Sequence, residues 1–257
     1  MELGLKNRSV LITGGSKGIG LACARAFLDE GARVAIVSRE RGNLDRAAAQ
    51  LGKITLIAAD LTRADDAQRM AREAETAIGP IDVLVNSAGA AKRYPPDELN
   101  AQAWHAAMDA KYFTYIHAMD AVLPSMRDRK RGNVVNIIGT GGKVASPIHL
   151  PGGAANSALM LASVGLASVY GKFGVRINAI NPGATLTERV EEALALEAER
   201  QGITRDEALA RGQAKVPLGR FANPEEIADV ALFLASRRAS YVSGAIIPMD
   251  GVGAPLI

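Results

Sequence analysis

The chain contains little cysteine, few aromatic residues and almost no excess charge. Its single cysteine, Cys23, excludes an internal disulfide and fits a reducing cytoplasm, where we expect it to pack within a helix. Aromatic residues make up 4% of the 257 residues, and the formal net charge is +3. The densest basic run, Arg127 to Arg131, includes Asp128. A charge this small does not indicate a nucleic-acid partner, so we expect none.

Long apolar runs and clusters of metal ligands are also missing. Residues 1–9 contain no apolar signal-peptide core, and no run of 18 apolar residues occurs. The three histidines stand far apart, and no His, Cys or carboxylate cluster has the spacing of metal ligands. We therefore expect no metal, no export signal and no membrane partner, and a cytoplasmic location.

A glycine-rich turn is the most informative stretch that the chain does contain. In the run Val10 to Gly20, an apolar strand pattern gives way to Gly14, Gly18 and Gly20, and a helix pattern follows. Glycine lets the backbone turn tightly and approach a ligand closely, because it has no Cβ. The free N–H groups at the start of a helix suit a pyrophosphate. The setting predicts a dinucleotide site, and a structural turn without a ligand is the alternative.

Strand and helix patterns alternate along the whole chain. Strands are expected at 8–13, 32–38, 54–60, 81–89, 132–139, 175–181 and 244–250, and helices at 21–31, 41–51, 64–78, 100–126, 153–170 and 223–236. Near-continuous apolar strands between helices predict a parallel sheet covered on both faces. The fold class is therefore α/β: a doubly wound Rossmann-type three-layer sandwich with a central parallel sheet of about seven strands and ligands at the carboxyl ends.

The same pattern predicts one domain over residues 1–257. The charged, helical segment 187–213 is long for a connection between a strand and a helix. We expect this segment to form a lid over the substrate.

Five motifs occur in a fixed order and spacing. They are Thr13-Gly14…Gly18-Ile19-Gly20, Asp60-Leu61, Asn86-Ser87-Ala88-Gly89, Asn181-Pro182-Gly183 and the run 219–236, GRFANPEEIADVALFLAS. With these motifs the chain resembles the short-chain dehydrogenase/reductase family over essentially its whole length. The resemblance implies a nicotinamide dinucleotide across the strand ends and hydride transfer to or from a carbonyl or alcohol.

The resemblance also assigns the cofactor's contacts along the chain. Residues of the glycine turn would hold the pyrophosphate: Gly14, Ser16, Lys17, Gly18, Ile19 and Gly20. The adenosine side would meet Asp60, Leu61, Asn86, Ala88 and Gly89. The nicotinamide half would meet Asn156, Pro182, Gly183 and Thr187.

The end of the second strand predicts which dinucleotide is preferred. An enzyme that prefers NAD usually carries an acidic residue there. This chain has Ser38 and Arg39 there, with Lys17 inside the glycine turn. Both cations can pair with a 2′-phosphate, which favours NADP(H) over NAD(H). The alternative is two ordinary surface cations, with Glu40 in the acidic role.

The catalytic positions depart from the family pattern. The family uses a tyrosine as general acid/base, a lysine four residues later, a serine thirteen residues before the tyrosine and an asparagine on the preceding long helix. Alignment of the motifs places Gly152, Asn156, Gly139 and Lys111 at these four positions. The resemblance therefore implies that the ordinary proton relay is absent.

Three residues are candidate substitutes for that relay. His149 precedes Gly152 by three residues, and an imidazole exchanges protons near neutral pH. Lys111 and Thr140 are further candidates. The alternatives are a histidine in an exposed loop, a solvated lysine and a threonine that only turns the chain.

A group of cations in the same region bears on the ligand. Lys92, Arg93, Lys111 and Lys143 would ring the mouth of the pocket and favour an anionic or CoA-linked ligand.

The helix that begins near Gly152 is rich in small residues, which let another helix approach closely. In the family this helix forms a dimer contact, so we expect a homo-oligomer, either a dimer or a tetramer, or a hetero-oligomer with an active relative. Tight packing on the chain's own sheet is the alternative.

Two functions remain open from the sequence. One is an NADP(H)-dependent oxidoreductase that acts on a small carbonyl or alcohol with a non-standard proton donor. The other is a non-catalytic family member, serving as a partner subunit or a dinucleotide-responsive binding protein.

Overall fold

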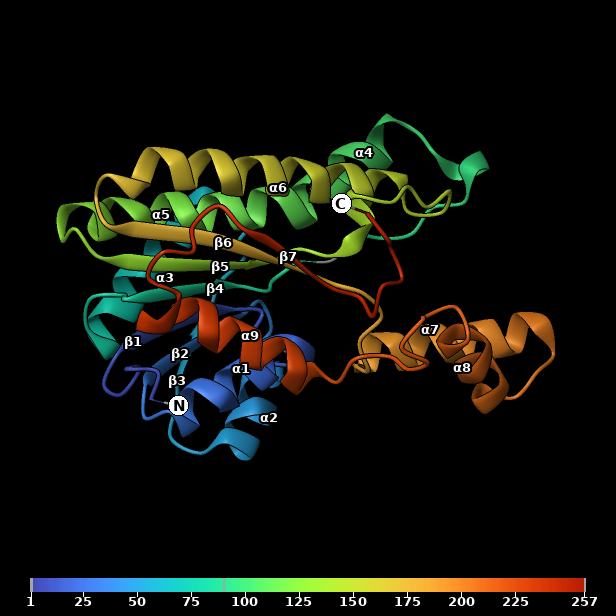
Figure 1. Ribbon diagram of the computed structural model, residues 1–257, viewed down its shortest axis with the longest axis horizontal. Coiled ribbons are helices and arrows are strands. Elements are labelled where there is room, and N and C mark those ends of the chain that lie inside the picture. The colour runs from blue at the N-terminus through green and yellow to red at the C-terminus, as the bar shows by residue number, and fades with distance from the viewer. Residues whose placement is uncertain (1, 90, 257) are drawn as a thin grey trace.

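A computed structural model describes residues 2–89 and 91–256 (Figure 1). The strands are β1 Ser9–Thr13, β2 Arg33–Ser38, β3 Thr55–Ala58, β4 Val83–Asn86, β5 Gly132–Ile137, β6 Val175–Pro182 and β7 Ile246–Met249. The α-helices are α1 Gly18–Asp29, α2 Arg41–Leu51, α3 Ala64–Ile78, α4 Ala101–Ala107, α5 Thr114–Asp128, α6 Leu150–Gly171, α7 Glu188–Gln201, α8 Arg205–Gln213 and α9 Pro224–Ala235.

The described strands form one parallel sheet in the order β3-β2-β1-β4-β5-β6-β7. The chain reverses its direction of winding between β1 and β4, so the connections that follow these two strands diverge there. The register pairs Thr13 with Asn86 and Asn86 with Asn136, which places the ends of three central strands in one row. The expected doubly wound parallel sheet is confirmed.

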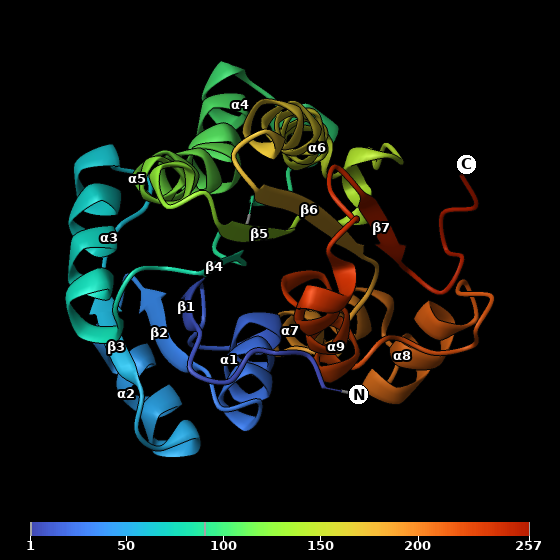
Figure 2. The same ribbon diagram turned by 60° about the vertical axis from the view of Figure 1, so that its left-hand side comes forward.

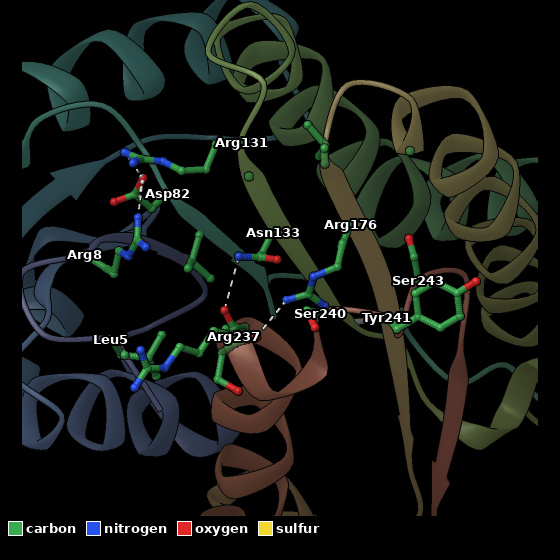
Figure 3. A pocket seen from close by; sticks show the side chains of 18 residues that line it. Leu5, Arg8, Asp82, Arg131, Asn133, Arg176, Arg237, Ser240, Tyr241 and Ser243 are labelled. Atoms are coloured by element: carbon green, nitrogen blue, oxygen red, sulfur yellow. Dashed lines mark hydrogen bonds and ion pairs between the residues drawn. The ribbon is translucent and has the colours of Figure 1, made fainter. Parts of the chain in front are cut away.

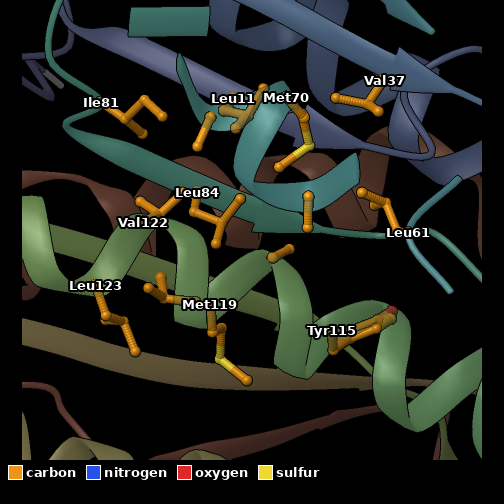
Figure 4. Packing of buried hydrophobic residues seen from close by; sticks show 14 of the residues in the cluster. Leu11, Val37, Leu61, Met70, Ile81, Leu84, Tyr115, Met119, Val122 and Leu123 are labelled. Carbon is orange, nitrogen blue, oxygen red and sulfur yellow. The ribbon is translucent and has the colours of Figure 1, made fainter. Parts of the chain in front are cut away.

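Helices cover both faces of the sheet (Figure 2). One face packs against α3, α5 and α6, and its core includes Leu11, Leu84, Tyr115 and Met119 (Figure 4). The other face packs against α1, α2 and α9. Cys23 lies buried in α1, where burial raises the pKa of its thiol to about 12. That thiol is an unreactive packing residue, as expected from the sequence.

Two helices differ from the expected bounds near the strand ends. The helix expected over 100–126 is α4 and α5 joined by a π-helical stretch, Met108–Phe113. Such wide turns often lie at functional sites. The helix expected from 153 begins at Leu150, with Pro151 in its first turn. Proline is tolerated there because a backbone N–H in the first turn has no hydrogen-bond partner within the helix. This earlier start places Gly152 and Asn156 inside the first two turns of α6.

The helix α6 is, among the residues that the structure describes, the one helix long and apolar enough to cross a membrane. The helix also has the features of a core helix, because its inner face packs against the sheet and contributes Leu159 and Ala167 to the main apolar cluster. We assign it to the core.

The segment 187–213 forms two helices rather than one. The helix α7 ends at Gly202, whose φ of +63° suits glycine, and α8 begins with a capping box of Thr204 and Glu207. The pair has a small apolar cluster of its own, which includes Leu194 and Ala208. In Figure 1 both helices project beyond the carboxyl ends of the strands, next to the end of β6.

Candidate functional site

A cleft of about 500 Å³ lies at the carboxyl ends of β1, β2 and β4, at the reversal of strand order. Of the residues expected at a cofactor, the cleft is lined by Gly14, Ser16, Lys17, Gly18, Ile19, Ser38, Arg39, Asp60, Leu61, Ala88, Gly89 and Thr187. Segments far apart in the sequence therefore meet around one cavity. Its size suits a small-molecule cofactor.

The glycines of the first turn permit this close packing. A Cβ at Gly14 would lie 2.8 Å from the backbone of Ala88, and Gly14 has a φ of +66°. A Cβ at Gly20 would lie 2.2 Å from the carbonyl oxygen of Gly14. Gly20 is buried and does not line the cleft. Its role is close packing of the turn against α1, whereas Gly14 and Gly18 border the cavity.

Charges of both signs lie on the wall formed by the end of β2. Lys17 and Arg39 are exposed and line the cleft, and neither has an ion pair among the described residues. Glu40 is also exposed there, and one of its carboxylate oxygens accepts a hydrogen bond from Asn43 Nδ2 at 3.2 Å. Lys17 and Arg39 thus outnumber Glu40 at the end of β2, while the carboxylates of Asp60, Glu188 and Glu192 line other parts of the cleft.

Asn86, expected beside adenosine, is not among the residues that line the cleft. Its side chain is fully buried and belongs to a polar chain across the sheet. Thr13 Oγ1 donates to Asn86 Oδ1 at 3.2 Å, and Asn86 Nδ2 donates to Asn136 Oδ1 at 2.9 Å. Asn136 Nδ2 in turn donates to Ser163 Oγ at 2.9 Å. These bonds satisfy buried polar groups and hold three strand ends and α6 together.

The expected contacts at the end of β6 also lie outside the cleft lining. A Cβ at Gly183 would lie 2.9 Å from Cα of Asp250, so this glycine is needed for close packing of the chain. The carbonyl oxygen of Pro182 lies 3.9 Å from a Cβ built at Gly139. Pro182 therefore borders the region around Gly139 rather than the described cavity.

Position 152 is the centre of the second part of the site. Gly152 is buried, and a Cβ built on it would lie 2.2 Å from His149 Cε1 and 2.5 Å from His149 Nε2. The imidazole of His149 therefore fills the space that a side chain at position 152 would enter. The expected exposed-loop alternative is wrong, since His149 is half-buried directly before α6.

Asn156 lies beside the same space. Its Nδ2 is 3.5 Å from a Cβ built at Gly139 and 3.6 Å from one built at Gly141. Gly139 has a φ of +127°, a conformation that side chains rarely adopt, so a serine would be strained there. Asn156 Oδ1 and His149 Nδ1 are buried and have no hydrogen-bond partner among the described residues. Both side chains also border Gly141, where a built Cβ would lie 3.4 Å from His149 Cδ2 and 3.6 Å from Asn156 Nδ2.

The environment of His149 favours its neutral form. Burial lowers the pKa of His149 below its ordinary value, and the positive charges of Arg93, Arg189 and Lys111 lower it further. At neutral pH the imidazole therefore carries no charge and can accept a proton.

Lys111 is buried, so the expected solvated lysine is wrong. Its Nζ donates to Tyr115 Oη at 2.8 Å and to the carbonyl oxygen of Ile137 at 3.2 Å. Burial, with a contribution from Arg189, lowers the pKa of Lys111 to about 7. Burial also raises the pKa of Tyr115, which donates its hydroxyl to Ile137. Lys111 therefore exchanges a proton near neutral pH, whereas Tyr115 stays neutral.

Thr140 belongs to a turn. It opens a single 3₁₀ turn after β5, and its carbonyl oxygen accepts from the backbone N–H groups of Lys143 and Val144. The backbone of Thr140 therefore forms a turn, which is the alternative to a catalytic role that the sequence left open. Lys143 is exposed.

Several cleft residues have no motif that marks them in the sequence. They are Val37, Asn43, Ala59, Thr62, Ala110, Thr114, Glu188, Arg189 and Glu192. Glu188, Arg189 and Glu192 lie on the first turns of α7, and the spacings 188–192 and 189–192 place them near one another on that helix.

A second cavity, of about 570 Å³, lies at the opposite edge of the sheet (Figure 3). There the buried carboxylate of Asp82 is 2.8 Å from Arg131 and 3.6 Å from Arg8. Arg176 donates to the carbonyl oxygens of Leu234 and Ser236 at the end of α9. These charges hold the amino ends of the strands together, and doubly wound sheets bind ligands at the other edge. We therefore place the functional site in the first cleft.

Comparisons with known proteins agree over nearly the whole chain. A family model, adh_short_C2, described as enoyl-(acyl carrier protein) reductase, matches residues 14–252. The chain is 37% identical over 251 residues to 2-(S)-hydroxypropyl-CoM dehydrogenase 3 of Xanthobacter autotrophicus, covering 96% of each. It is 33% identical over 230 residues to the inactive 2-(S)-hydroxypropyl-CoM dehydrogenase 2 of that organism, covering 89% of this chain and 97% of the relative. The structure of L-sorbose reductase from Gluconobacter frateurii, complexed with NADPH and L-sorbose, matches with a TM-score of 0.94 and 27% identity, covering 100% of both chains.

The buried amine of Lys111 predicts a pH-dependent stability. Its pKa is about 7 in the folded chain against the ordinary 10.5, so the unfolded chain binds one more proton between these values. The free energy of unfolding therefore rises with pH over this range, by up to about 1.4 kcal/mol per pH unit. Denaturant unfolding of the wild type and Lys111→Met from pH 7 to pH 10 measures the difference between them. A constant difference would contradict the lowered pKa.

Proposed function

We propose that this chain, which belongs to the short-chain dehydrogenase/reductase family, is an NADP(H)-dependent oxidoreductase that interconverts a carbonyl and an alcohol. We propose His149 as its general acid/base. The observation that carries this proposal is steric. The imidazole fills the side-chain space of Gly152, the position of the family's tyrosine in the sequence alignment.

The residues of the cleft fit a dinucleotide. The glycine turn leaves room for a pyrophosphate, with Ser16, Lys17, Gly18 and Ile19 on the cavity wall. Lys17 and Arg39 suit the 2′-phosphate that distinguishes NADP(H). The unsatisfied Oδ1 of Asn156 suits a ribose hydroxyl as its hydrogen-bond donor. When bound, the nicotinamide would donate or accept the hydride.

The chain's own residues would move the proton. In carbonyl reduction, the protonated imidazole of His149 donates a proton to the carbonyl oxygen. In alcohol oxidation, the neutral imidazole accepts the hydroxyl proton. Burial and the nearby charges of Arg93, Arg189 and Lys111 disfavour the imidazolium, so the neutral form, which accepts the proton in alcohol oxidation, is the main form at neutral pH. Lys111 supports the site as a charge that itself changes near pH 7.

We propose that the pair α7–α8 acts as a lid over this site within a single domain. Its own apolar cluster allows the two helices to move as a unit, and Thr187, Glu188 and Arg189 already border the cleft. A free, unreactive cysteine supports a cytoplasmic location.

A homo-oligomer fits the outer surface of α6. Leu161, Val164 and Val169 are exposed there at 77%, 41% and 57% of their surface. An apolar helix surface of this kind is covered in most proteins. We propose a dimer or tetramer of this chain, with association with an active relative as the alternative.

A non-catalytic role is the second candidate function. The absence of side chains at positions 139 and 152 favours it, and so does the 33% identity to a relative named inactive. In that role the protein would bind a dinucleotide, or pair with an active chain, without turning over a substrate. The following experiment on His149 separates the two candidates.

His149→Ala is expected to lower kcat by about 10²–10⁴-fold while the Kd for NADPH stays unchanged, because proton transfer is lost and the cofactor cleft is intact. His105→Ala, an exposed histidine on α4, is the matched control. In the wild type the reduction rate falls as pH rises through the lowered pKa of His149, and the oxidation rate rises. NADPH absorbance across a carbonyl and alcohol panel measures both. If NADPH binds but no hydride is transferred to any substrate, the protein is the non-catalytic member.

Arg39→Ala is expected to raise the Kd for NADPH by about tenfold to 100-fold and to leave the Kd for NADH unchanged. The reason is the loss of one charge-assisted hydrogen bond, worth about 1.5–3 kcal/mol. Calorimetric titration with both cofactors measures this. Arg41→Ala is the control, since Arg41 pairs with Asp45 outside the cleft lining. Equal losses for NADPH and NADH would contradict a contact with the 2′-phosphate.

Leu161→Glu is expected to dissociate the oligomer, because it places a charge in the middle of the apolar surface of α6. Light scattering coupled to size exclusion measures the mass. Ser157→Glu, an exposed position one turn earlier, shows the effect of charge alone. A wild-type chain that is already monomeric would refute the assembly.

A further inference from the structure

The lid helix α7 places a cation next to the general acid/base. Arg189 is exposed, and its Nη2 donates to the carbonyl oxygen of Ala91 at 3.4 Å. The Cβ of Ala91 lies 2.9 Å from a Cβ built at Gly152, the point that the His149 imidazole also reaches. Ala91 therefore contacts the guanidinium through its carbonyl oxygen, and its side chain borders the space that the imidazole fills.

A second cation comes from the loop that contains this segment. The backbone N–H of Tyr94 donates to the carbonyl oxygen of Ile148 at 3.0 Å, which holds the loop against the chain before His149. The exposed Arg93 lies between Ala91 and Tyr94. Its charge is close enough to lower the pKa of both His149 and Arg189.

The charges around His149 are predominantly positive. Lys111 is buried on the π-helical stretch, and Arg93 and Arg189 are exposed. Glu192 acts on Arg189, and Glu188 lines the neighbouring cleft. Among the charges that shift the pKa of His149, however, all are cations. Like charges that converge on one point repel one another until an anion is bound.

We propose that the substrate carries an anionic group, a carboxylate, sulfonate or phosphate, which Arg189 and Arg93 bind while His149 exchanges the proton at the neighbouring carbon–oxygen group. This inference rests on the proposed function. A guanidinium presents a planar pair of donors that matches such groups. Arg189 comes from the lid, so binding of the anion also holds the lid closed over the reacting atoms.

We assign the anionic group that Arg189 binds to the substrate and not to the phosphates of the cofactor. The phosphate cradle of the cleft is the glycine turn with Lys17, on the far side of Thr187. Thr187 packs over that turn, with its Cγ2 3.3 Å from a Cβ built at Gly18. Arg189 also borders the cleft, but its Nη2 donates to the carbonyl oxygen of Ala91, whose side chain borders the space filled by His149.

Calorimetric titration of the NADP⁺ complex tests the proposal, since a ketone cannot react with the oxidised cofactor. The probes are two matched pairs: acetoacetate with methyl acetoacetate, and dihydroxyacetone phosphate with dihydroxyacetone. We expect the charged member of at least one pair to bind about tenfold or more tightly. Arg189→Gln and Arg93→Gln should each remove that preference, and Arg200→Gln, an exposed arginine on the same helix, should not.

The outcomes separate this inference from the proposed function. Preferential binding of the anion without hydride transfer in the NADPH assay supports the anion site of Arg189 and Arg93 and refutes both the oxidoreductase and the proton exchange by His149. Hydride transfer without any preference for the charged probes refutes the inference alone. If Arg189→Gln weakens binding of NADP⁺ and not of the acids, the arginine reads the cofactor's phosphates and the inference is wrong. Absence of binding by every probe also overturns it.

Discussion

A side chain at position 152 and the imidazole of His149 cannot occupy the same volume. Any Cβ at Gly152 would lie within 2.5 Å of two imidazole atoms, well inside van der Waals contact. His149 can therefore occupy its position only because residue 152 is a glycine. Gly139, with a positive φ, lies beside Asn156, whose Oδ1 has no hydrogen-bond partner among the residues that the structure describes. Glycine at two catalytic positions is thus compatible with a different proton donor rather than only with loss of activity.

The electrostatics of the site follow from where its cations are anchored. Lys111 is held below the surface by Tyr115 and Ile137, and the cost of burying its charge brings its pKa to about 7. Arg93 and Arg189 are instead exposed at the mouth. The buried amine of Lys111 can give up its proton, whereas the two arginines stay charged and can bind an anion. The anionic group of a substrate would form ion pairs with Arg93 and Arg189.

The sequence was sufficient for the scaffold and for half of the site. Apolar strands and the glycine turn are local patterns, so the parallel sheet and most of the cleft lining could be predicted. Asn86 could not be placed, because its bonds to Thr13 and Asn136 depend on the register between strands. Lys111 could not be recognised as buried, because the π-helical stretch turns it inward. His149 reaches position 152 because α6 begins at Leu150, three residues before the small-residue pattern suggests.

Transfer of an isotope label tests the central claim most directly. The protein would be incubated with NADPH deuterated at the transferable position and a mixture of oxo acids, and the alcohols analysed by mass spectrometry. The account predicts deuterium at the carbinol carbon of an acidic product with the wild-type protein, and label transfer about 10²–10⁴-fold slower with His149→Ala. Label transferred equally well by the His149 variant would show that another residue supplies the proton. If the wild type binds NADPH but transfers no label, the proposal that this chain is an oxidoreductase is contradicted.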